Sequence, residues 1–309
     1  MIEKGTNEVK LSIVMMTFNQ GGFIRDAIDS VLKQYKPFTW ELHIGDDNSK
    51  DNTQVVISDY LELYSNIFYH KNSENIGLHQ NYITLIQKTK GEFIALLEAD
   101  DYWIDEKKCY YQIQQLEENP NMAWSFTNSI TVDLNKKILT QSDYKLPEKF
   151  NLDFFVINFF NPPSNSIIFR KDAEPNNYAD FFFKIIQWDT TLLYLRLLTQ
   201  NNKYSEIGFV NILGLAWRRH SAATSATLFS GEKRYKDWII LNNELKKRVP
   251  VHLKKHFNKN YVAYENLFLL FLKKMNYRKS ISYFLKMLFN KPLRPEKEYK
   301  DLFWKIKNL

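Results

Sequence analysis

The first hundred residues of this chain alternate between short apolar runs and longer amphipathic segments, and this alternation constrains the fold more than any other feature. Residues Leu11–Thr17, with the sequence LSIVMMT, are rich in branched side chains, which is typical of a buried strand. Similar runs occupy residues 40–44, 66–70 and 92–97, and helical periodicity fills residues 23–32, 55–63 and 78–89 between them. Strands that alternate with helices predict βαβ units with right-handed crossovers. The sequence therefore predicts an α/β fold in which helices flank a mostly parallel sheet.

After residue 120 the alternation gives way to an irregular pattern and then to helices. Strands are predicted at 122–128, 130–139, 166–170 and 209–217, and an amphipathic helix at 187–200. From residue 231 the pattern is helical, with segments at 231–248, 256–274, 277–289 and 296–308. We therefore expect two domains, residues 1–230 and a helical region at residues 231–309.

Charge is distributed unevenly between these two parts. The chain of 309 residues has a net charge of +7, but residues 231–309 hold 20 Lys and Arg against 7 Asp and Glu. The first 230 residues are therefore mildly acidic, so we expect no nucleic-acid partner for a surface of this kind. Aromatic residues make up 16% of the chain, which suits a large core or a surface that contacts sugars or lipid.

Other features of the sequence bear on the cellular compartment. The single cysteine, Cys109, excludes a disulfide framework and a cysteine-based zinc site, and it favours a reducing compartment. The residues after Met1 lack the basic start and apolar stretch of a secretory signal, and no apolar window reaches the ~18 residues of a membrane span. We expect a cytoplasmic protein, either free or bound peripherally to the inner face of the plasma membrane.

Polar side chains follow the ends of three predicted strands. Asn19 follows the first strand, Asp46 and Asp47 the second, and Asp100 and Asp101 the fourth. In a parallel sheet, ligands bind beyond the carboxyl ends of the strands. We therefore expect one ligand to contact all three loops.

The adjacent carboxylates Asp100 and Asp101 favour a divalent cation, because two ionised neighbours repel each other unless a cation or ligand hydroxyls satisfy them. Mg²⁺ or Mn²⁺ with a nucleotide pyrophosphate fits this need, since hard cations prefer oxygen ligands. The alternative for Asp100 and Asp101 is a helix N-cap, and the alternative for Asp46 and Asp47 is an Asx turn. The sequence has no glycine-rich phosphate loop, so a nucleotide would be held by carboxylates, metal and other side chains.

Four short motifs together resemble those of family 2 glycosyltransferases. In chain order they are Met16–Asn19 (MTFN), Asp46–Thr53 (DDNSKDNT), Asn75–Gly77 (NIG) and Leu97–Trp103 (LEADDYW). Fainter similarity continues through residues 166–170, 187–189 and 217–220, so that the resemblance spans residues 1–225 and leaves the tail unexplained. It implies a GT-A fold, with a Rossmann-like nucleotide-binding half, and the use of a nucleotide sugar.

The resemblance also implies roles for individual residues at the nucleotide. Phe18 takes the position of an aromatic residue that packs on the nucleobase, and Asp47 would accept a hydrogen bond from the uracil imide. Asp100 would hold the ribose or support the metal, and Arg218 would steady the diphosphate. Glu98 stands where many members have Asp. The residues assigned to nucleotide binding are Thr17, Phe18, Asn19, Asp47, Asn75, Asp100 and Arg218.

The same resemblance assigns the metal, the catalytic base and the acceptor site. Asp101 and His220 are assigned to the metal, with a phosphate contact as the alternative for His220. Asp189 matches the carboxylate that acts as catalytic base in inverting members, and Trp188 would offer a flat face to the acceptor sugar. Other interpretations stay open: a helix N-cap for Asp189, a core position for Trp188, and a solvated basic cluster at residues 218–220.

These features predict a metal-dependent inverting glycosyltransferase with Mn²⁺ or Mg²⁺ as cofactor. A UDP-sugar is the favoured donor and a dTDP-sugar the alternative, and the acceptor is a hydroxyl of a glycan, a lipid-linked molecule or a protein. The expected setting is bacterial surface polysaccharide or glycan synthesis. Alternatives are a sugar-nucleotide-binding protein without transferase activity and a nucleic-acid-binding protein that uses the basic tail.

The basic, aromatic tail itself admits three interpretations. Its helices could lie on an anionic membrane surface, where a lipid-linked acceptor is found. They could instead bind a partner protein, or pack on the catalytic domain with their lysines facing water.

Overall fold

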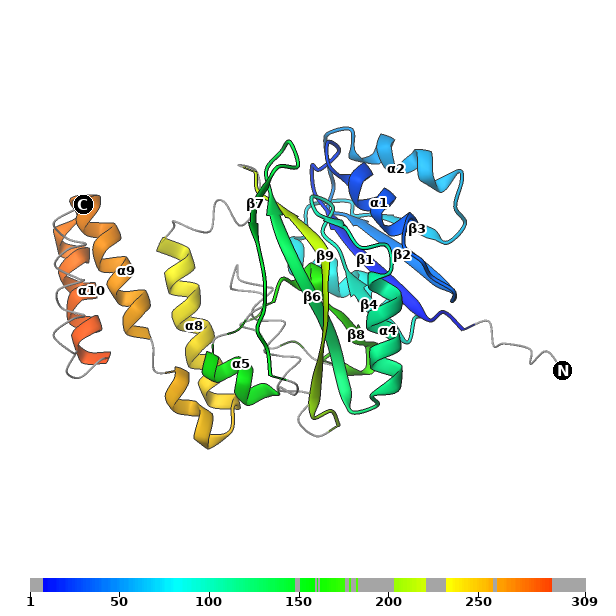
Figure 1. Cartoon of the computed structure of the whole chain (residues 1–309). Helices are drawn as coiled ribbons and strands as arrows, with labels where there is room; N and C mark the ends of the chain where they lie inside the picture. Colours follow the sequence, from blue (N-terminus) through cyan, green and yellow to red (C-terminus); the bar gives the residue numbers. More distant parts are fainter. Residues whose placement is uncertain are drawn as a thin grey trace. The chain divides into compact units, whose positions relative to one another are not determined.

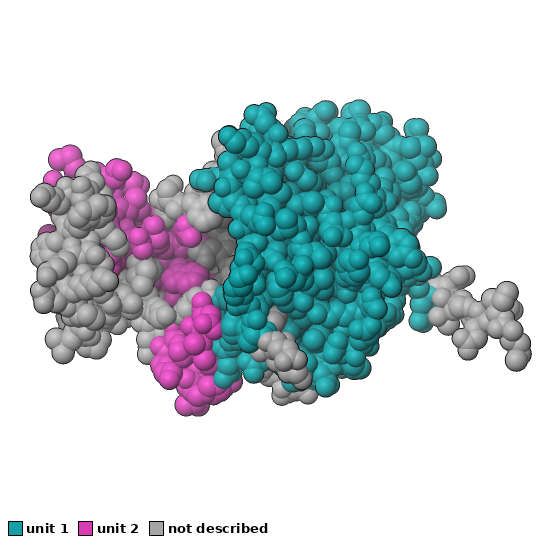
Figure 2. Space-filling model, in the orientation of Figure 1, with its two compact units in different colours: residues 1–155, 159–178, 195–223 teal, residues 156–158, 179–194, 224–309 magenta. Residues whose placement is uncertain are grey.

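The computed structural model describes residues 8–147, 151–158, 160, 162–175, 178, 182, 203–220, 232–257 and 260–290. The chain divides into two compact units (Figure 2). Unit 1 consists of residues 1–155, 159–178 and 195–223, and unit 2 consists of residues 156–158, 179–194 and 224–309. The domain boundary expected at residue 230 stays a prediction.

The described strands of unit 1 form one nine-stranded sheet in the order β3-β2-β1-β4-β8-β6-β9-β5, with β7 paired to β6 (Figure 1). They are β1 (Leu11–Thr17), β2 (Trp40–Asp46), β3 (Ile67–Lys71), β4 (Phe93–Leu96), β5 (Tyr102–Trp103), β6 (Met122–Val132), β7 (Ile138–Gln141), β8 (Ile168–Arg170) and β9 (Glu206–Arg218). Strands β1 to β4 are parallel to one another, β8 runs antiparallel to β4 and β6, and β5 runs antiparallel to β9. The expected α/β fold is confirmed.

Helices occupy the segments between the strands and most of the described part of unit 2. They are α1 (Ile24–Leu32), α2 (Thr53–Leu61), α3 (Leu78–Ile86), α4 (Lys108–Glu118), α5 (Leu152–Asn158), α8 (Glu232–Arg248), α9 (Asn260–Lys273) and α10 (Tyr277–Asn290), with 3-10 turns at η1 (Ser164–Ser166), η2 (Lys171–Ala173) and η4 (Val251–Phe257). None of the helices in the described ranges combines the length and apolar composition that a bilayer crossing requires.

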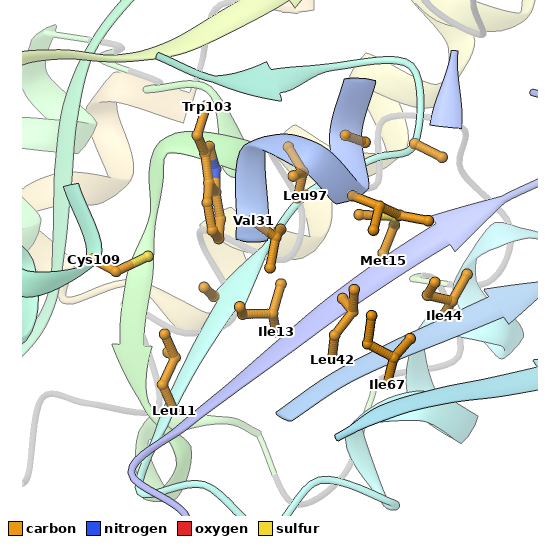
Figure 3. Packing of buried hydrophobic residues seen from close by; sticks show 14 of the residues in the cluster. Leu11, Ile13, Met15, Val31, Leu42, Ile44, Ile67, Leu97, Trp103 and Cys109 are labelled. Carbon is orange, nitrogen blue, oxygen red and sulfur yellow. The ribbon is translucent and has the colours of Figure 1, made fainter. Parts of the chain in front are cut away.

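The core of unit 1 lies between the parallel strands and the helices that cover them. All seven residues of β1 are buried, and Ile13 and Met15 stand in register with Leu42 and Ile44 of β2. These four side chains and Val31 of α1 belong to one apolar cluster (Figure 3). Burial of each such side chain contributes roughly 1.5–3 kcal/mol. The packed core therefore holds the strand ends, from which the polar loops begin.

One pair of predicted strands differs from the structure. The sequence suggested separate strands at 122–128 and 130–139, whereas β6 is continuous and a turn separates it from β7. Asp133 closes this turn, because its Oδ1 accepts the N–H groups of Asn135 and Lys137, both at 2.9 Å, and Lys136 adopts φ +62°. The predicted helices at 187–200 and 296–308 lie outside the described residues.

A buried polar cluster crosses the sheet on the face opposite α1. His43 of β2 places Nδ1 at 3.0 Å from Nε2 of His70 on β3, and its Nε2 lies 3.2 Å from Oε1 of Glu41. Burial lowers the pKa of His70 to about 4, and the proximity of His43 and of the Lys88 ammonium acts in the same direction. Burial also lowers the pKa of His43, against the attraction of Glu41. Both imidazoles are therefore neutral in the folded protein near pH 7.

Stability should consequently fall as the pH decreases from about 6.5 to about 4. In that window the unfolded chain takes up protons at both histidines, whereas folded His70 stays neutral until its pKa of about 4. We expect His70→Asn to flatten the pH dependence of the urea unfolding midpoint. The exposed His252 supplies the control variant His252→Asn. An unaltered pH profile in His70→Asn would show that the cluster does not couple protonation to folding.

Candidate functional site

Three polar loops lie side by side at the carboxyl ends of β1, β2 and β4. β1 lies between the other two strands in the sheet. Beyond the regular ladder, the Asp47 N–H donates to the Thr17 carbonyl at 3.0 Å, and the Ala99 N–H donates to the Met16 carbonyl at 3.2 Å. The loops after these strands therefore start from adjacent points on one edge of the sheet.

The first carboxylate after β2, Asp46, is occupied by its own loop. It is fully buried, and it accepts the Ser49 N–H at 2.7 Å and the Tyr69 hydroxyl at 2.6 Å. Burial and the hydrogen bond to Asp46 raise the pKa of Tyr69, so this phenol remains a donor. Asp46 therefore fixes the turn in the way that an Asx-type interaction would.

The second carboxylate, Asp47, organises the loop before α3. It accepts the N–H groups of Ile76 at 2.8 Å and Gly77 at 2.9 Å, and the Nδ2 of Asn72 at 3.0 Å. Two of these bonds end on Oδ1 and one on Oδ2. A carboxylate offers about four acceptor positions, so Oδ2 keeps capacity for a further donor. Asn75 lies in the same loop with an exposed side chain.

The loop after β1 presents an aromatic ring beside these carboxylates. Phe18 is 46% exposed, which leaves its ring open to stack on a planar group. Asn19 adopts φ +53°, its N–H donates to Ser49 Oγ at 2.8 Å, and its Oδ1 accepts the Lys50 N–H at 2.8 Å. These bonds tie the loops after β1 and β2 together. Thr17 is buried, and its Oγ1 has no hydrogen-bond partner among the described residues.

The loop after β4 gathers the acidic residues. Glu98, Asp100 and Asp101 each bring a carboxylate oxygen within 4.8 Å of the others. Asp100 is 7% exposed, and its Oδ2 lies 3.0 Å from Nε2 of His220. Its Oδ1 is buried without a hydrogen-bond partner in the part of the chain that the structure describes. Because a buried polar atom without a partner is energetically unfavourable, this oxygen is the best candidate in the cluster for binding a ligand.

Asp101 has the opposite surroundings, since both of its oxygens accept hydrogen bonds from the protein. Oδ1 accepts the Arg218 N–H at 2.8 Å, and Oδ2 accepts Nδ2 of Asn165 at 2.5 Å. Complete burial, and then the negative charge of Asp100, raise the pKa of Asp101 well above its ordinary value, although the two hydrogen bonds act in the opposite direction. A cation beside this pair would relieve the repulsion.

The pairing of β5 with β9 explains why His220 meets Asp100 across 120 positions of the sequence. Tyr102 stands opposite Ala216 in this antiparallel pair. The residues before Tyr102 therefore run alongside those after Ala216, which brings Asp101 to the Arg218 N–H and Asp100 to His220.

The Arg218 side chain points toward α1. It is 2% exposed, and its Nη2 contacts Oδ2 of Asp26 at 2.7 Å. Its guanidinium lies 5.0 Å from the ring centre of Phe23 and 5.3 Å from that of Tyr102. Burial opposes ionisation of Asp26, but its bonds to Lys136 and Arg218 outweigh this and lower its pKa. The role of Arg218 at the diphosphate stays a prediction.

Asn165 of η1 is a site residue that sequence reasoning missed. Its Nδ2 donates to Asp101, its Oδ1 accepts the Glu98 N–H at 3.2 Å, and its carbonyl accepts the indole N–H of Trp103 at 3.0 Å. It thereby fixes both ends of the acidic loop. The available signal was its place at the end of a Pro-Pro-Ser-Asn stretch directly before a strand.

We expect Asn165→Ala to destabilise the protein by about 1–3 kcal/mol, because it leaves the Glu98 N–H and an Asp101 oxygen buried without their partner. Urea unfolding followed by fluorescence measures this change. Asn135→Ala, at an exposed turn position, is the matched control and should leave the midpoint unchanged. Equal urea unfolding midpoints for the two variants would show that Asn165 does not stabilise the acidic loop.

The acidic cluster fits a hard divalent cation. Its donors are carboxylate oxygens and one imidazole, and Asp100 Oδ1 is buried with no hydrogen-bond partner in the described ranges. Mg²⁺ and Mn²⁺ prefer oxygen ligands and need few of them from the protein. Two predicted residues, Trp188 and Asp189, lie outside the described residues, so their assignments stay predictions.

Solved structures with a similar fold are glycosyltransferases. Staphylococcus aureus TarS residues 1–349 in complex with UDP-GlcNAc superimposes with a TM-score of 0.70 at 17% identity, covering 92% of this chain and 82% of that one. At this identity the likeness concerns the fold alone, which is of the GT-A type. The glycosyl transferase family 2 model matches residues 12–175, more than half of the chain. The protein belongs to glycosyl transferase family 2, as the four motifs indicated.

Two relatives indicate how far the similarity extends. An uncharacterised Mycobacterium bovis protein is 36% identical over 117 residues, which are 38% of this chain and 34% of that protein. The chain thus spans about a third of the length of relatives of this kind. The Escherichia coli enzyme WfgD, named as a UDP-Glc:α-D-GlcNAc-diphosphoundecaprenol β-1,3-glucosyltransferase, is 25% identical over 235 residues, covering 75% of this chain and 85% of WfgD.

Proposed function

We propose that this protein is a metal-dependent inverting glycosyltransferase that moves a sugar from a nucleotide diphosphate sugar to a hydroxyl acceptor. The observation that carries the proposal is the close group of Glu98, Asp100 and Asp101, in which His220 contacts Oδ2 of Asp100 and the buried Oδ1 of Asp100 lacks a partner among the described residues. This cluster follows β4, next to the loop that exposes Phe18. An exposed aromatic ring beside a cation site suits a nucleotide better than a free sugar.

Mn²⁺ or Mg²⁺ bound here would offset the negative charge that builds on the departing diphosphate. Asp100 would be its principal protein ligand through Oδ1, with His220 and Glu98 beside it. Asp101, whose two oxygens already accept hydrogen bonds, would contribute chiefly its charge and the position of the loop.

The nucleoside would lie against the loops after β1 and β2. The ring of Phe18 would stack on the base, and Oδ2 of Asp47 would accept the imide N–H of uracil, which its remaining acceptor capacity supports. Thr17, Asn19 and the exposed Asn75 would border this site. A UDP-sugar is the favoured donor, and the UDP-Glc in the name of WfgD and the UDP-GlcNAc bound to TarS support that choice. A dTDP-sugar carries the same imide.

Asp189 would be the catalytic base, and Trp188 would face the acceptor. The acceptor oxygen bonds to the anomeric carbon while its proton passes to the Asp189 carboxylate. On the opposite face, the bond from that carbon to the diphosphate oxygen breaks, and the nucleoside diphosphate leaves with the bonding electrons. Attack opposite the leaving group inverts the anomeric configuration.

The acceptor would be a growing bacterial surface polysaccharide or glycan, and a lipid-linked acceptor is the form that the name of WfgD supports. A glycan or protein hydroxyl would satisfy the same chemistry. The reaction would then take place in the cytoplasm, at the inner face of the plasma membrane.

A ligand screen tests the proposal at the level of the donor. We expect UDP and UDP-sugars to raise the melting temperature in the presence of Mn²⁺, and chelation with EDTA to abolish the effect. A ligand at 100 times its Kd adds about 2.7 kcal/mol to stability, which is readily detected. GDP and ADP are the controls. If all three nucleotides act equally with and without metal, the proposed donor site is wrong.

A further inference from the structure

An apolar stripe runs along the exposed side of α10 in unit 2. Tyr277, Ile281 and Leu285 are spaced four residues apart, so they share one face of the helix. Their exposed fractions are 54%, 59% and 47%. Met275, directly before the helix, is 72% exposed.

The stripe does not take part in the packing between α10 and α9. α9 and α10 lie side by side (Figure 1). Their packing uses another face of α10, where Ser280 Oγ donates to the Phe268 carbonyl at 3.2 Å and the ring centres of Phe268 and Phe284 lie 5.3 Å apart. Ser280 and Met287 on this face are 1% exposed. The exposed apolar residues are therefore additional to those that hold the helix pair together.

The surroundings of the stripe are strongly basic. Residues 266–290 contain five Lys and Arg and no Asp or Glu. The basic residues are Lys273, Lys274, Arg278, Lys279 and Lys286, and all five are exposed. An acidic neighbour is Glu232 of α8, whose pKa is lowered by a hydrogen bond to Lys236 and by the charges of Lys236, Lys279 and Lys274. An apolar stripe in predominantly basic surroundings matches a surface that is both apolar and anionic.

We propose that the α9–α10 surface, defined by Tyr277, Ile281 and Leu285 with the five basic residues around them, binds an anionic lipid bilayer. The apolar side chains enter the boundary between headgroups and acyl chains, and the basic side chains contact lipid phosphates. A second copy of the chain is a poorer occupant, because a symmetric contact would bring the same positive charges together. The inference stands apart from the proposed transferase function, since vesicles alone test it.

The experiment is co-sedimentation of the full chain with vesicles of pure phosphatidylcholine and of phosphatidylcholine mixed equally with phosphatidylglycerol. We expect binding to the anionic vesicles alone, and its loss at high salt. Arg278→Gln with Lys279→Gln should weaken binding about thirty-fold, since each basic residue near the surface contributes about a factor of five. Ile281→Ser with Leu285→Ser should weaken it at least as much.

Control variants change the same kinds of residue on unit 1. Leu63→Ser, at a position that is 74% exposed, matches the apolar change, and Lys33→Gln with Lys137→Gln matches the charge change. Both controls should bind like the unchanged protein, and melting curves should show every variant folded. Equal binding to neutral vesicles, or binding that survives Ile281→Ser with Leu285→Ser, would overturn the proposal. So would a dimer in solution that these substitutions abolish, since the stripe would then face a second copy.

Discussion

Replacement of Asp100 by Asn is expected to reduce sugar transfer by about 10²- to 10³-fold, the range seen when one stabilising group for developing charge is removed. Its Oδ1 is buried without a partner among the described residues, so the charge serves a ligand rather than the fold. The Mn²⁺-dependent rise in melting temperature with UDP should disappear as well. Transfer assays with a UDP-sugar and melting curves with and without Mn²⁺ measure the two effects.

The stability of Asp100→Asn in the absence of metal distinguishes this role from a structural one. Asp100 contributes to the raised pKa of Asp101, so removal of its charge should leave the metal-free protein as stable as before or more stable. Asp59→Asn is the control, because Asp59 is an exposed carboxylate paired with Arg25 on the surface. Marked destabilisation of Asp100→Asn, or full activity with unchanged metal dependence, contradicts the assignment.

Replacement of Asp189 by Asn is expected to lower kcat by about 10²- to 10⁴-fold, the usual contribution of a positioned general base. Binding of the UDP-sugar in the presence of Mn²⁺ should remain, since the base acts on the acceptor and not on the nucleotide. Transfer kinetics and calorimetric titration of the donor separate these two effects. The assignment depends on the motif alone, because the residue lies outside the described ranges.

The paired measurement also discriminates between enzyme and binding protein. If the unchanged protein binds UDP-sugars but transfers nothing to a set of acceptors, the chain is a sugar-nucleotide-binding protein. If Asp189→Asn transfers sugar at the original rate, another group accepts the proton. Asp172→Asn is a control of the same chemical change, because Asp172 of η2 is a carboxylate that forms an ion pair with Lys203.

The order of strands and helices in the first hundred residues could be predicted because it depends on local periodicity. The loops after β1, β2 and β4 could also be placed at one edge, since parallel strands leave their carboxyl ends together. The different surroundings of Asp100 and Asp101 could not be predicted from the sequence. It depends on the Arg218 N–H and on Asn165, which lie 117 and 64 positions away from Asp101.

The sequence does not reveal side-chain contacts between segments that lie far apart along the chain. Asp26 stood in a predicted helix, and nothing in its neighbourhood indicated an ion pair with Arg218 across 192 positions. The motif alone predicts Arg218 at the diphosphate, whereas in the structure its guanidinium contacts the carboxylate of Asp26. Side-chain partners of this kind follow from the register of β9, which periodicity does not specify.

The acidic cluster is assembled from two distant segments of the chain, which the pairing of the two-residue strand β5 with β9 aligns. Recombination or protein engineering can separate these two segments. Asp100 and Asp101 come from the N-terminal half, whereas His220 and the Arg218 N–H arrive only through the alignment of β9 with Tyr102. A chimera that exchanges the nucleotide-binding segment between relatives must therefore carry its own β9. A shift of one residue in that alignment would turn successive side chains to the other side of the sheet and dismantle the cluster.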